Sequence, residues 1–144
     1  IRVNLKKPKW SLKIMELKTH LEAKKEILGK PVDLKTGKYA KVELLATDEM
    51  RVDSKGLIHG GFTFGVADYA AMLAINHPNV VLGSSEVKFT APVSVGDLML
   101  AHAKIIEKKG KRMLVDVEVT VEERIVLNGK MTCFVLDHHV LENT

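Results

Sequence analysis

One stretch of the chain constrains the fold more than any other, because it consists almost entirely of small and apolar residues. It spans residues 58–79 and reads IHGGFTFGVADYAAMLAINHPN. Its apolar residues recur at helical density, and Asn76, His77 and Pro78 supply a stop signal. Its richness in Ala and Gly predicts a helix that other backbone encloses on most sides.

The chain after this helix alternates between apolar and polar residues, which is the pattern of strands. The cleanest alternation places apolar side chains at every second position from Met113 to Val121. Asn128-Gly129 would ordinarily signal a two-residue hairpin, but the strand before it would then be very short. We therefore expect a bulge at Gly129 within one long strand. The predicted strands are 39–47, 80–90, 97–108, 113–121 and 125–136.

This layout predicts an α+β fold in which one antiparallel sheet of about five strands curls around one helix. A sheet of this kind has two edges with unpaired backbone groups, and such edges invite pairing with a second copy. The chain of 144 residues is the size of one domain, 1–144.

The residues before the first strand predict an extension of that domain. Residues 1–9 form a basic arm, and an amphipathic pattern from Trp10 to Leu28 predicts a helix of about 17 residues. Gly29, Lys30 and Pro31 would end it, so we assign 1–30 to this arm and helix. The first residue is Ile, which leaves open whether a further segment precedes it.

Charge and cysteine content narrow the class of protein. The net charge of +4 is compatible with a phosphate-bearing partner. Cys133 is the only cysteine, which excludes an intrachain disulfide framework and a thiolate-rich zinc site and fits a reducing cytoplasm. No apolar run approaches the roughly 18 residues of a membrane span, so we expect a cytoplasmic location and no membrane partner.

The sequence predicts a functional site where the loop enters the central helix. Gly60 and Gly61 stand at that point, and the backbone N–H groups at a helix start are unsatisfied donors with partial positive charge. Without side chains, they let a carbonyl or phosphate approach closely, as an oxyanion hole requires. Asp68 follows in an otherwise apolar helix, where a carboxylate is costly unless it is exposed, paired or functional.

The spacing of His59, Gly60, Gly61 and Asp68 resembles the signature of hotdog-fold thioesterases of the PaaI-like class. The turn from Ala91 to Asp97 and the strand order are similar to that family as well, and the resemblance covers residues 39–137, the expected hotdog core. It implies a curled sheet around a central helix, dimers joined edge to edge, and active sites at the subunit interface.

The resemblance also implies roles for these residues. The Gly60 N–H would polarise a thioester carbonyl, and Asp68, contributed across the dimer interface, would activate water or attack the carbonyl itself. His59 would shape the turn beside the site, with Gly61 in contact with substrate. Asp53 is a further candidate for contact with substrate, at a position where some members carry Asn, but a carboxylate cannot donate the hydrogen bonds of an amide.

Two further groups are candidates for substrate contacts. Ser84, Ser85 and Glu86 are alternative matches to a family residue that helps hold water, and Ser85 is the one we select. The basic cluster Lys108–Arg112 is either a solvated hairpin tip or, as the resemblance suggests, a clamp for coenzyme A phosphates through Lys109 and Arg112. The cluster is short and lacks interleaved aromatics, so we expect no nucleic-acid partner in this segment.

The chain also resembles the acyl-CoA-binding hotdog domain of the FapR family of transcriptional regulators, which senses malonyl-CoA without hydrolysis. The stretch 122–130, EERIVLNGK, is similar in kind. That family has an Arg before the equivalent glycine and an Asn at the place of Asp68, whereas this chain has His59 and Asp68. An Asn cannot act as a general base at neutral pH, so the difference favours catalysis.

The expected function is therefore an acyl-CoA thioesterase, and the alternative is a non-catalytic, FapR-like acyl-CoA sensor or regulatory domain. A dehydratase-like hotdog activity is a third possibility, but its motif is not found. The expected partners are acyl-CoA and further copies of the chain, in a homodimer or a tetramer joined through sheet edges. We expect no metal and no cofactor apart from the coenzyme A of the substrate.

Overall fold

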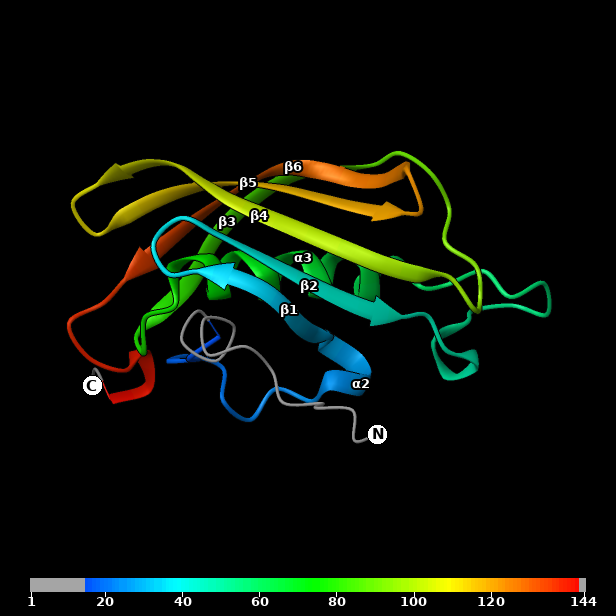
Figure 1. Cartoon of the computed structure of the whole chain (residues 1–144), viewed down its shortest axis with the longest axis horizontal. Coiled ribbons are helices and arrows are strands. Elements are labelled where there is room, and N and C mark those ends of the chain that lie inside the picture. The colour runs from blue at the N-terminus through cyan, green and yellow to red at the C-terminus, as the bar shows by residue number, and fades with distance from the viewer. Residues whose placement is uncertain (1–14, 143–144) are drawn as a thin grey trace, which may run out of the picture.

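A computed structural model describes residues 15–142 and has an α+β architecture, with a six-stranded antiparallel sheet curled around one long helix (Figure 1). The spatial order of the strands is β1-β2-β4-β5-β6-β3. The strands are β1 Lys30–Lys35, β2 Tyr39–Leu45, β3 Val80–Phe89, β4 Leu98–Lys109, β5 Arg112–Val121 and β6 Arg124–Val135. The helices are α2 Lys25–Leu28 and α3 Gly60–Ile75, with 3-10 turns η1 Asp48–Met50 and η2 Val140–Glu142. The predicted fold class is confirmed.

The long helix α3 is enclosed as its composition predicts. Every residue from Tyr69 to Ile75 is buried, and the alanines among them allow close approach to the inner face of the sheet. The sheet supplies small residues in return, including Ala101 and Ala103 on β4. The helix ends at Asn76, whose left-handed conformation (φ 53°) terminates it where the stop signal predicts.

The predicted N-terminal helix is wrong for residues 15–24, and only Lys25–Leu28 are helical. The part of that prediction before residue 15 lies outside the described residues. The reason is tertiary hydrogen bonding to the buried Asn76. Its side-chain amide donates to the Glu16 carbonyl (2.9 Å) and its Oδ1 accepts from the Lys18 N–H (2.8 Å). These bonds replace the local ones of a helix, so tertiary contacts override the amphipathic pattern.

Strand β1 is missing from the sequence prediction, which placed a helix stop and a turn there. It is an edge strand in which only Leu34 is fully buried, so it lacks an alternating apolar signal. Pro31 is compatible with an edge because one side of such a strand needs no N–H donor.

The long strand β6 is confirmed, but the bulge expected at Gly129 is wrong. Gly129 pairs in regular register with Val117 and Val87 on either side. The irregularity in the β5–β6 pairing lies between Val119 and Thr120 instead. A Cβ at Gly129 would collide with the backbone of β3 at the Glu86 carbonyl, so close strand approach explains the glycine.

A second glycine fixes the extension against the core. Gly29 joins α2 to β1 with φ +106°, a conformation that L residues rarely adopt. A Cβ there would lie 2.6 Å from Val42 Cγ1 and 2.9 Å from the Glu43 carbonyl oxygen. Both conformation and space therefore require glycine at the point where the chain enters the sheet.

We predict that Gly29→Ala lowers the free energy of unfolding by about 3 kcal/mol, because the methyl group adds steric overlap to backbone strain. Gly37→Ala is the matched control, since Gly37 also has positive φ (+79°) but a methyl group there would meet no atom within 4 Å. Gly37→Ala should lower the free energy of unfolding by only about 1 kcal/mol. Urea unfolding followed by circular dichroism measures both, and equal losses would contradict the steric explanation.

Candidate active site at the central helix

The start of α3 is fixed by the loop that enters it. The His59 N–H donates to the Met50 carbonyl (3.0 Å) and the Ile58 N–H to the Val93 carbonyl (2.9 Å). His59 is the N-cap of the helix, and its Nδ1 accepts a hydrogen bond from the Gly61 N–H at 2.7 Å. The histidine thus shapes this turn, as the resemblance implies, by capping the helix.

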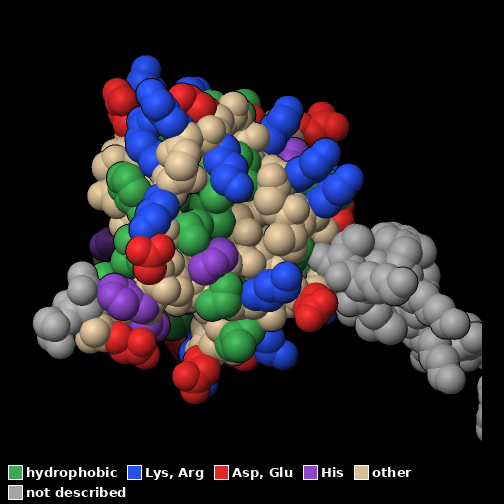
Figure 2. Space-filling model, turned by 90° about the vertical axis from the view of Figure 1, so that its left-hand side faces the viewer, with side chains coloured by type: hydrophobic (Ala, Val, Ile, Leu, Met, Phe, Trp, Pro, Cys, Tyr) green, Lys and Arg blue, Asp and Glu red, His purple; other side chains and the backbone are tan. Residues whose placement is uncertain are grey.

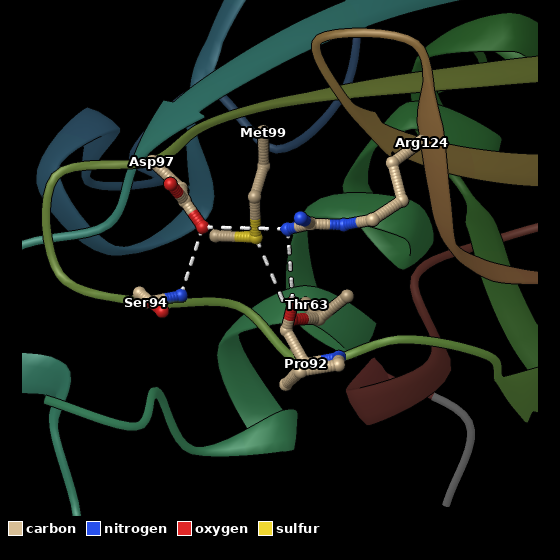
Figure 3. Close-up of polar contacts among 6 residues, drawn as sticks. All are labelled: Thr63, Pro92, Ser94, Asp97, Met99 and Arg124. Atoms are coloured by element: carbon tan, nitrogen blue, oxygen red, sulfur yellow. Dashed lines mark hydrogen bonds and ion pairs between the residues drawn. The ribbon is translucent and has the colours of Figure 1, made fainter. Parts of the chain in front are cut away.

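The turn from Ala91 to Asp97 supports the same end of the helix (Figure 3). The Arg124 guanidinium donates to the Pro92 carbonyl at 3.1 Å and lies 3.7 Å from the Asp97 carboxylate. The Ser94 N–H donates to that same carboxylate at 2.8 Å. Arg124 therefore ties the β5–β6 turn to the loop that holds Ile58.

The two glycines of the motif differ in their availability to a ligand. The Gly61 N–H is already donated to His59, so the expectation that both N–H groups are unsatisfied is wrong for Gly61. Within the described residues, no group accepts a hydrogen bond from the Gly60 N–H. A Cβ at Gly60 would lie 3.3 Å from the ring of Phe89, which is 55% exposed at the end of β3. Of the two glycines, Gly60 is therefore the one whose N–H can donate to a ligand oxygen, and the ring of Phe89 lies beside it.

Asp68 stands in the middle of α3 with an unsatisfied carboxyl oxygen. Its Oδ1 is buried and has no hydrogen-bond partner within the described residues. Burial raises the pKa of this carboxyl to about 6. The side chain lines a pocket of about 370 Å³ together with Thr19, His20, Leu82 and His139. Such a carboxyl retains its proton longer than an ordinary aspartate and is basic enough to accept one near neutrality.

A single chain does not bring Gly60 and Asp68 together. They are eight residues apart on one helix, a separation of about 12 Å along its axis. The pocket beside Asp68 and the groove beside His59 share no lining residue. One thioester carbonyl therefore cannot reach both groups within one subunit.

The remaining predicted residues line neither the Asp68 pocket nor the groove beside His59. Asp53 Oδ1 accepts the N–H groups of Lys55 (3.0 Å) and Leu57 (3.1 Å), so it organises its own loop. Ser85 is exposed on β3. Lys109 and Arg112 pair at the tip of the β4–β5 hairpin. Figure 2 shows the end of the molecule that carries this tip, where basic side chains gather in the upper part.

Sequence reasoning missed two histidines that line the Asp68 pocket. They are His20 and His139, which lie in segments on either side of the hotdog core. No local pattern marks the two histidines, because each reaches the pocket through tertiary folding. The ring of His20 lies 6.1 Å from that of Tyr69, and burial lowers the pKa of His20.

Residues 15–142 contain neither a metal-ligand cluster nor a membrane-spanning helix. No three His, Cys, Asp or Glu side chains in that range group as metal ligands would. No helix in the same range has the length and apolar character needed to cross a membrane.

Comparison with known proteins decides the family. A family model described as the thioesterase superfamily matches residues 55–127, which include the glycine turn, Asp68 and three strands of the sheet. The chain belongs to the thioesterase superfamily. The sheet curled around α3 is accordingly the hotdog fold, and the resemblance drawn from the sequence is confirmed.

Solved structures agree with this assignment. An uncharacterized protein from Pyrococcus horikoshii is 58% identical, with a TM-score of 0.86 over 88% of this chain and 97% of that one. A mutant of the phenylacetic acid degradation protein PaaI from Thermus thermophilus is 30% identical, with a TM-score of 0.70 over 78% and 97% of the two chains. A hypothetical thioesterase from Streptococcus pneumoniae, solved with coenzyme A, shares the fold at 18% identity, with a TM-score of 0.67 over 76% and 87% of the two chains.

Curated relatives are longer than this chain. A protein from Aquifex aeolicus named methylthioribose-1-phosphate isomerase is 48% identical over 85% of this chain, but the match spans only 27% of that protein. Transcription factor FapR from Caldanaerobacter subterraneus is 29% identical over 88% of this chain and 62% of its own length. The secondary resemblance to FapR is thereby confirmed.

We predict that His59→Ala lowers the free energy of unfolding by about 1 kcal/mol, because α3 loses its N-cap and the Gly61 N–H loses its acceptor. His59→Asn is the control, since Asn is among the best N-cap residues and should restore most of the loss. Thermal unfolding measures both. Equal destabilisation by Ala and Asn would show that capping is not the role of the imidazole.

Proposed function

We propose that the protein is an acyl-CoA thioesterase of the PaaI-like type. The observation that carries the proposal is Asp68, a carboxylate with a buried, unpartnered oxygen among the described residues and a pKa raised to about 6 in the wall of a pocket. Such a group is costly to the fold and suited to general-base or nucleophilic chemistry. Membership of the thioesterase superfamily supplies the class of reaction.

The reaction uses two groups. The Gly60 N–H donates a hydrogen bond to the thioester carbonyl oxygen and stabilises the negative charge that develops there. Asp68 takes a proton from water as the water oxygen bonds to the carbonyl carbon, and the tetrahedral intermediate then expels coenzyme A thiolate, which is protonated. Alternatively, the Asp68 carboxylate attacks the carbon, expels the thiolate and forms an anhydride that water hydrolyses.

A second copy of the chain would complete the site through the β3 edge. Within the described sheet, the backbone of this edge strand has no neighbour on one side, and Gly83–Glu86 are exposed. Antiparallel self-pairing with Ser84 opposite Ser85 would set Val80 opposite Phe89 of the second copy. Val80 lines the Asp68 pocket and Phe89 lies against Gly60. This register therefore brings Asp68 toward Gly60 of the second copy.

Basic residues at the tip of the β4–β5 hairpin support the proposal that the substrate carries coenzyme A. Lys109 and Arg112 lie beside Lys111, whose Nζ is 2.6 Å from the Asp137 carboxylate. That ion pair engages Lys111, whereas Lys109 and Arg112 are exposed and suited to contact phosphates. The coenzyme would enter as part of the substrate, in the cytoplasm.

A non-catalytic acyl-CoA sensor is the second candidate, because FapR proteins match over most of this chain. The two functions share ligand binding and differ in turnover. A thiol-release assay with acyl-CoAs of several chain lengths separates them. Tight binding of these ligands without release of thiol would establish the sensor and exclude the enzyme.

We predict that Asp68→Asn reduces kcat/KM by about 10²–10⁴-fold, because the amide cannot accept the proton. In the wild-type protein, kcat/KM should rise with pH to a plateau above the Asp68 pKa of about 6. The non-hydrolysable thioether S-decyl-CoA should bind both proteins alike. Asp116→Asn, on the exposed outer face, is the control. Unchanged turnover in Asp68→Asn would exclude Asp68 as base or nucleophile.

The same substitution has a predicted effect on stability. The folded-state pKa of Asp68, about 6, exceeds its ordinary value of 3.8. At pH values between these two pKa values, the folded protein therefore binds more protons than the unfolded protein. Stability is therefore lost as pH rises through that interval. Asp68→Asn should raise the free energy of unfolding by about 2 kcal/mol at pH 8 and by little at pH 4. A gain in stability that does not depend on pH would contradict the explanation from the raised pKa of Asp68.

If the active site is shared between two subunits, two inactive variants should complement each other when mixed. Gly60→Val should be inactive, because its side chain would meet the Phe89 ring and block the carbonyl. Refolded together with Asp68→Asn in equal amounts, it should restore about a quarter of wild-type activity, since each mixed dimer keeps one intact site. Two variants that stay inactive when mixed, although mixed dimers form, would contradict a site shared between subunits.

A further inference from the structure

A groove runs along the start of α3 on the side that faces α2. Its first section, about 450 Å³, is lined by Ile27, Leu28, His59, Gly61 and Phe62. A second section of about 440 Å³ shares Ile27 and Phe62 and continues over Met50. Each volume is within the roughly 300–1,000 Å³ typical of small-molecule sites, and the two sections are adjacent because Ile27 and Phe62 line both.

The wall that α2 contributes is held rigidly. Leu28 packs on α3, with its Cδ2 3.4 Å from the point where a Cβ at Gly65 would lie. Gly29 then fixes the exit of the chain from α2 against Val42. With Leu28 anchored, Ile27 is left 49% exposed at the groove. Leu28 and Gly29 therefore attach the backbone that carries Ile27 to the folded domain.

The groove begins at the helix start, where Gly60 can receive a carbonyl. Apart from His59, the side chains of the first section are apolar. The second section is bordered by Glu26, Asp48 and Glu49. Asp48 is paired with Arg51 (3.3 Å), and Glu26 and Glu49 repel phosphate and carboxylate. A ligand whose carbonyl lies at Gly60 would thus extend an apolar, uncharged tail into the groove and keep its phosphates elsewhere.

We propose that this groove binds the uncharged acyl chain of the substrate and that Ile27 and Phe62 limit the length of that chain. The proposal rests on the proposed function for the identity of the ligand as an acyl-CoA. It assigns specificity to the extension before the hotdog core, because Ile27 comes from that extension. It also predicts that acyl groups with a terminal carboxylate bind weakly.

Titration calorimetry with S-decyl-CoA and S-ethyl-CoA tests the groove without requiring hydrolysis. The wild-type protein should bind S-decyl-CoA about tenfold or more tightly than S-ethyl-CoA, because the longer chain buries more apolar surface. Ile27→Trp should fill the groove and weaken S-decyl-CoA about tenfold or more, with no change for S-ethyl-CoA. Leu21→Trp is the matched control, since Leu21 is 71% exposed and lines neither section.

The outcomes separate this proposal from the proposed function. If Ile27→Trp weakens only the decyl ligand but no acyl-CoA is hydrolysed by the wild type, the groove is supported and the enzyme is excluded. If acyl-CoAs are hydrolysed but Ile27→Trp affects both thioethers equally or neither, the groove proposal is overturned. A wild-type protein that binds the two thioethers equally overturns it too.

A smaller substitution tests the role of Ile27 even if the Trp variant does not fold. Ile27→Ala removes apolar contact without adding bulk, and it should weaken S-decyl-CoA about threefold to tenfold while S-ethyl-CoA is unaffected. Unchanged decyl binding in Ile27→Ala would overturn the role of Ile27 even if Ile27→Trp does not fold. Malonyl-CoA binding above that of acetyl-CoA would contradict the preference for uncharged chains.

Discussion

Close packing between α3 and the inner face of the sheet is the constraint on which the rest of the molecule depends. The helix is buried from Tyr69 to Ile75, and alanines on both α3 and β4 make that approach possible. In such surroundings a carboxylate loses most of its hydration, which is why Asp68 retains its proton to an unusually high pH. The packing that stabilises the fold therefore also raises the pKa of its central acid.

The sequence predicts the elements whose signal is local. Strands β3 to β6 and α3 follow from alternation, small-residue content and the stop at Asn76, and their ends fall within a few residues of the prediction. The failures have nonlocal causes. The Glu16 and Lys18 backbones bond to Asn76 instead of forming a helix, and β1 is an edge strand with little buried surface. Neither fact is visible in the periodicity of its own segment.

The candidate site, like the fold, has features that the sequence predicts and features that it does not. Gly60 and Asp68 are visible in the sequence because a glycine turn and an isolated acid stand out in an apolar helix. The use of the Gly61 N–H by His59, the ring of Phe89 beside Gly60 and the histidines around Asp68 depend on distances that folding sets. The motif thus identifies the candidate residues, while the atoms that surround them can be placed only from the structure.

Asn76 links parts of the chain that are far apart in sequence. Its buried amide holds Glu16 and Thr36, and its oxygen holds Lys18, so one side chain anchors the segment that places Thr19 and His20 over the Asp68 pocket. Within the described part of the chain, few other polar contacts retain that segment on the core. Amide hydrogen exchange in residues 15–20 therefore reports on the opening of one wall of the Asp68 pocket.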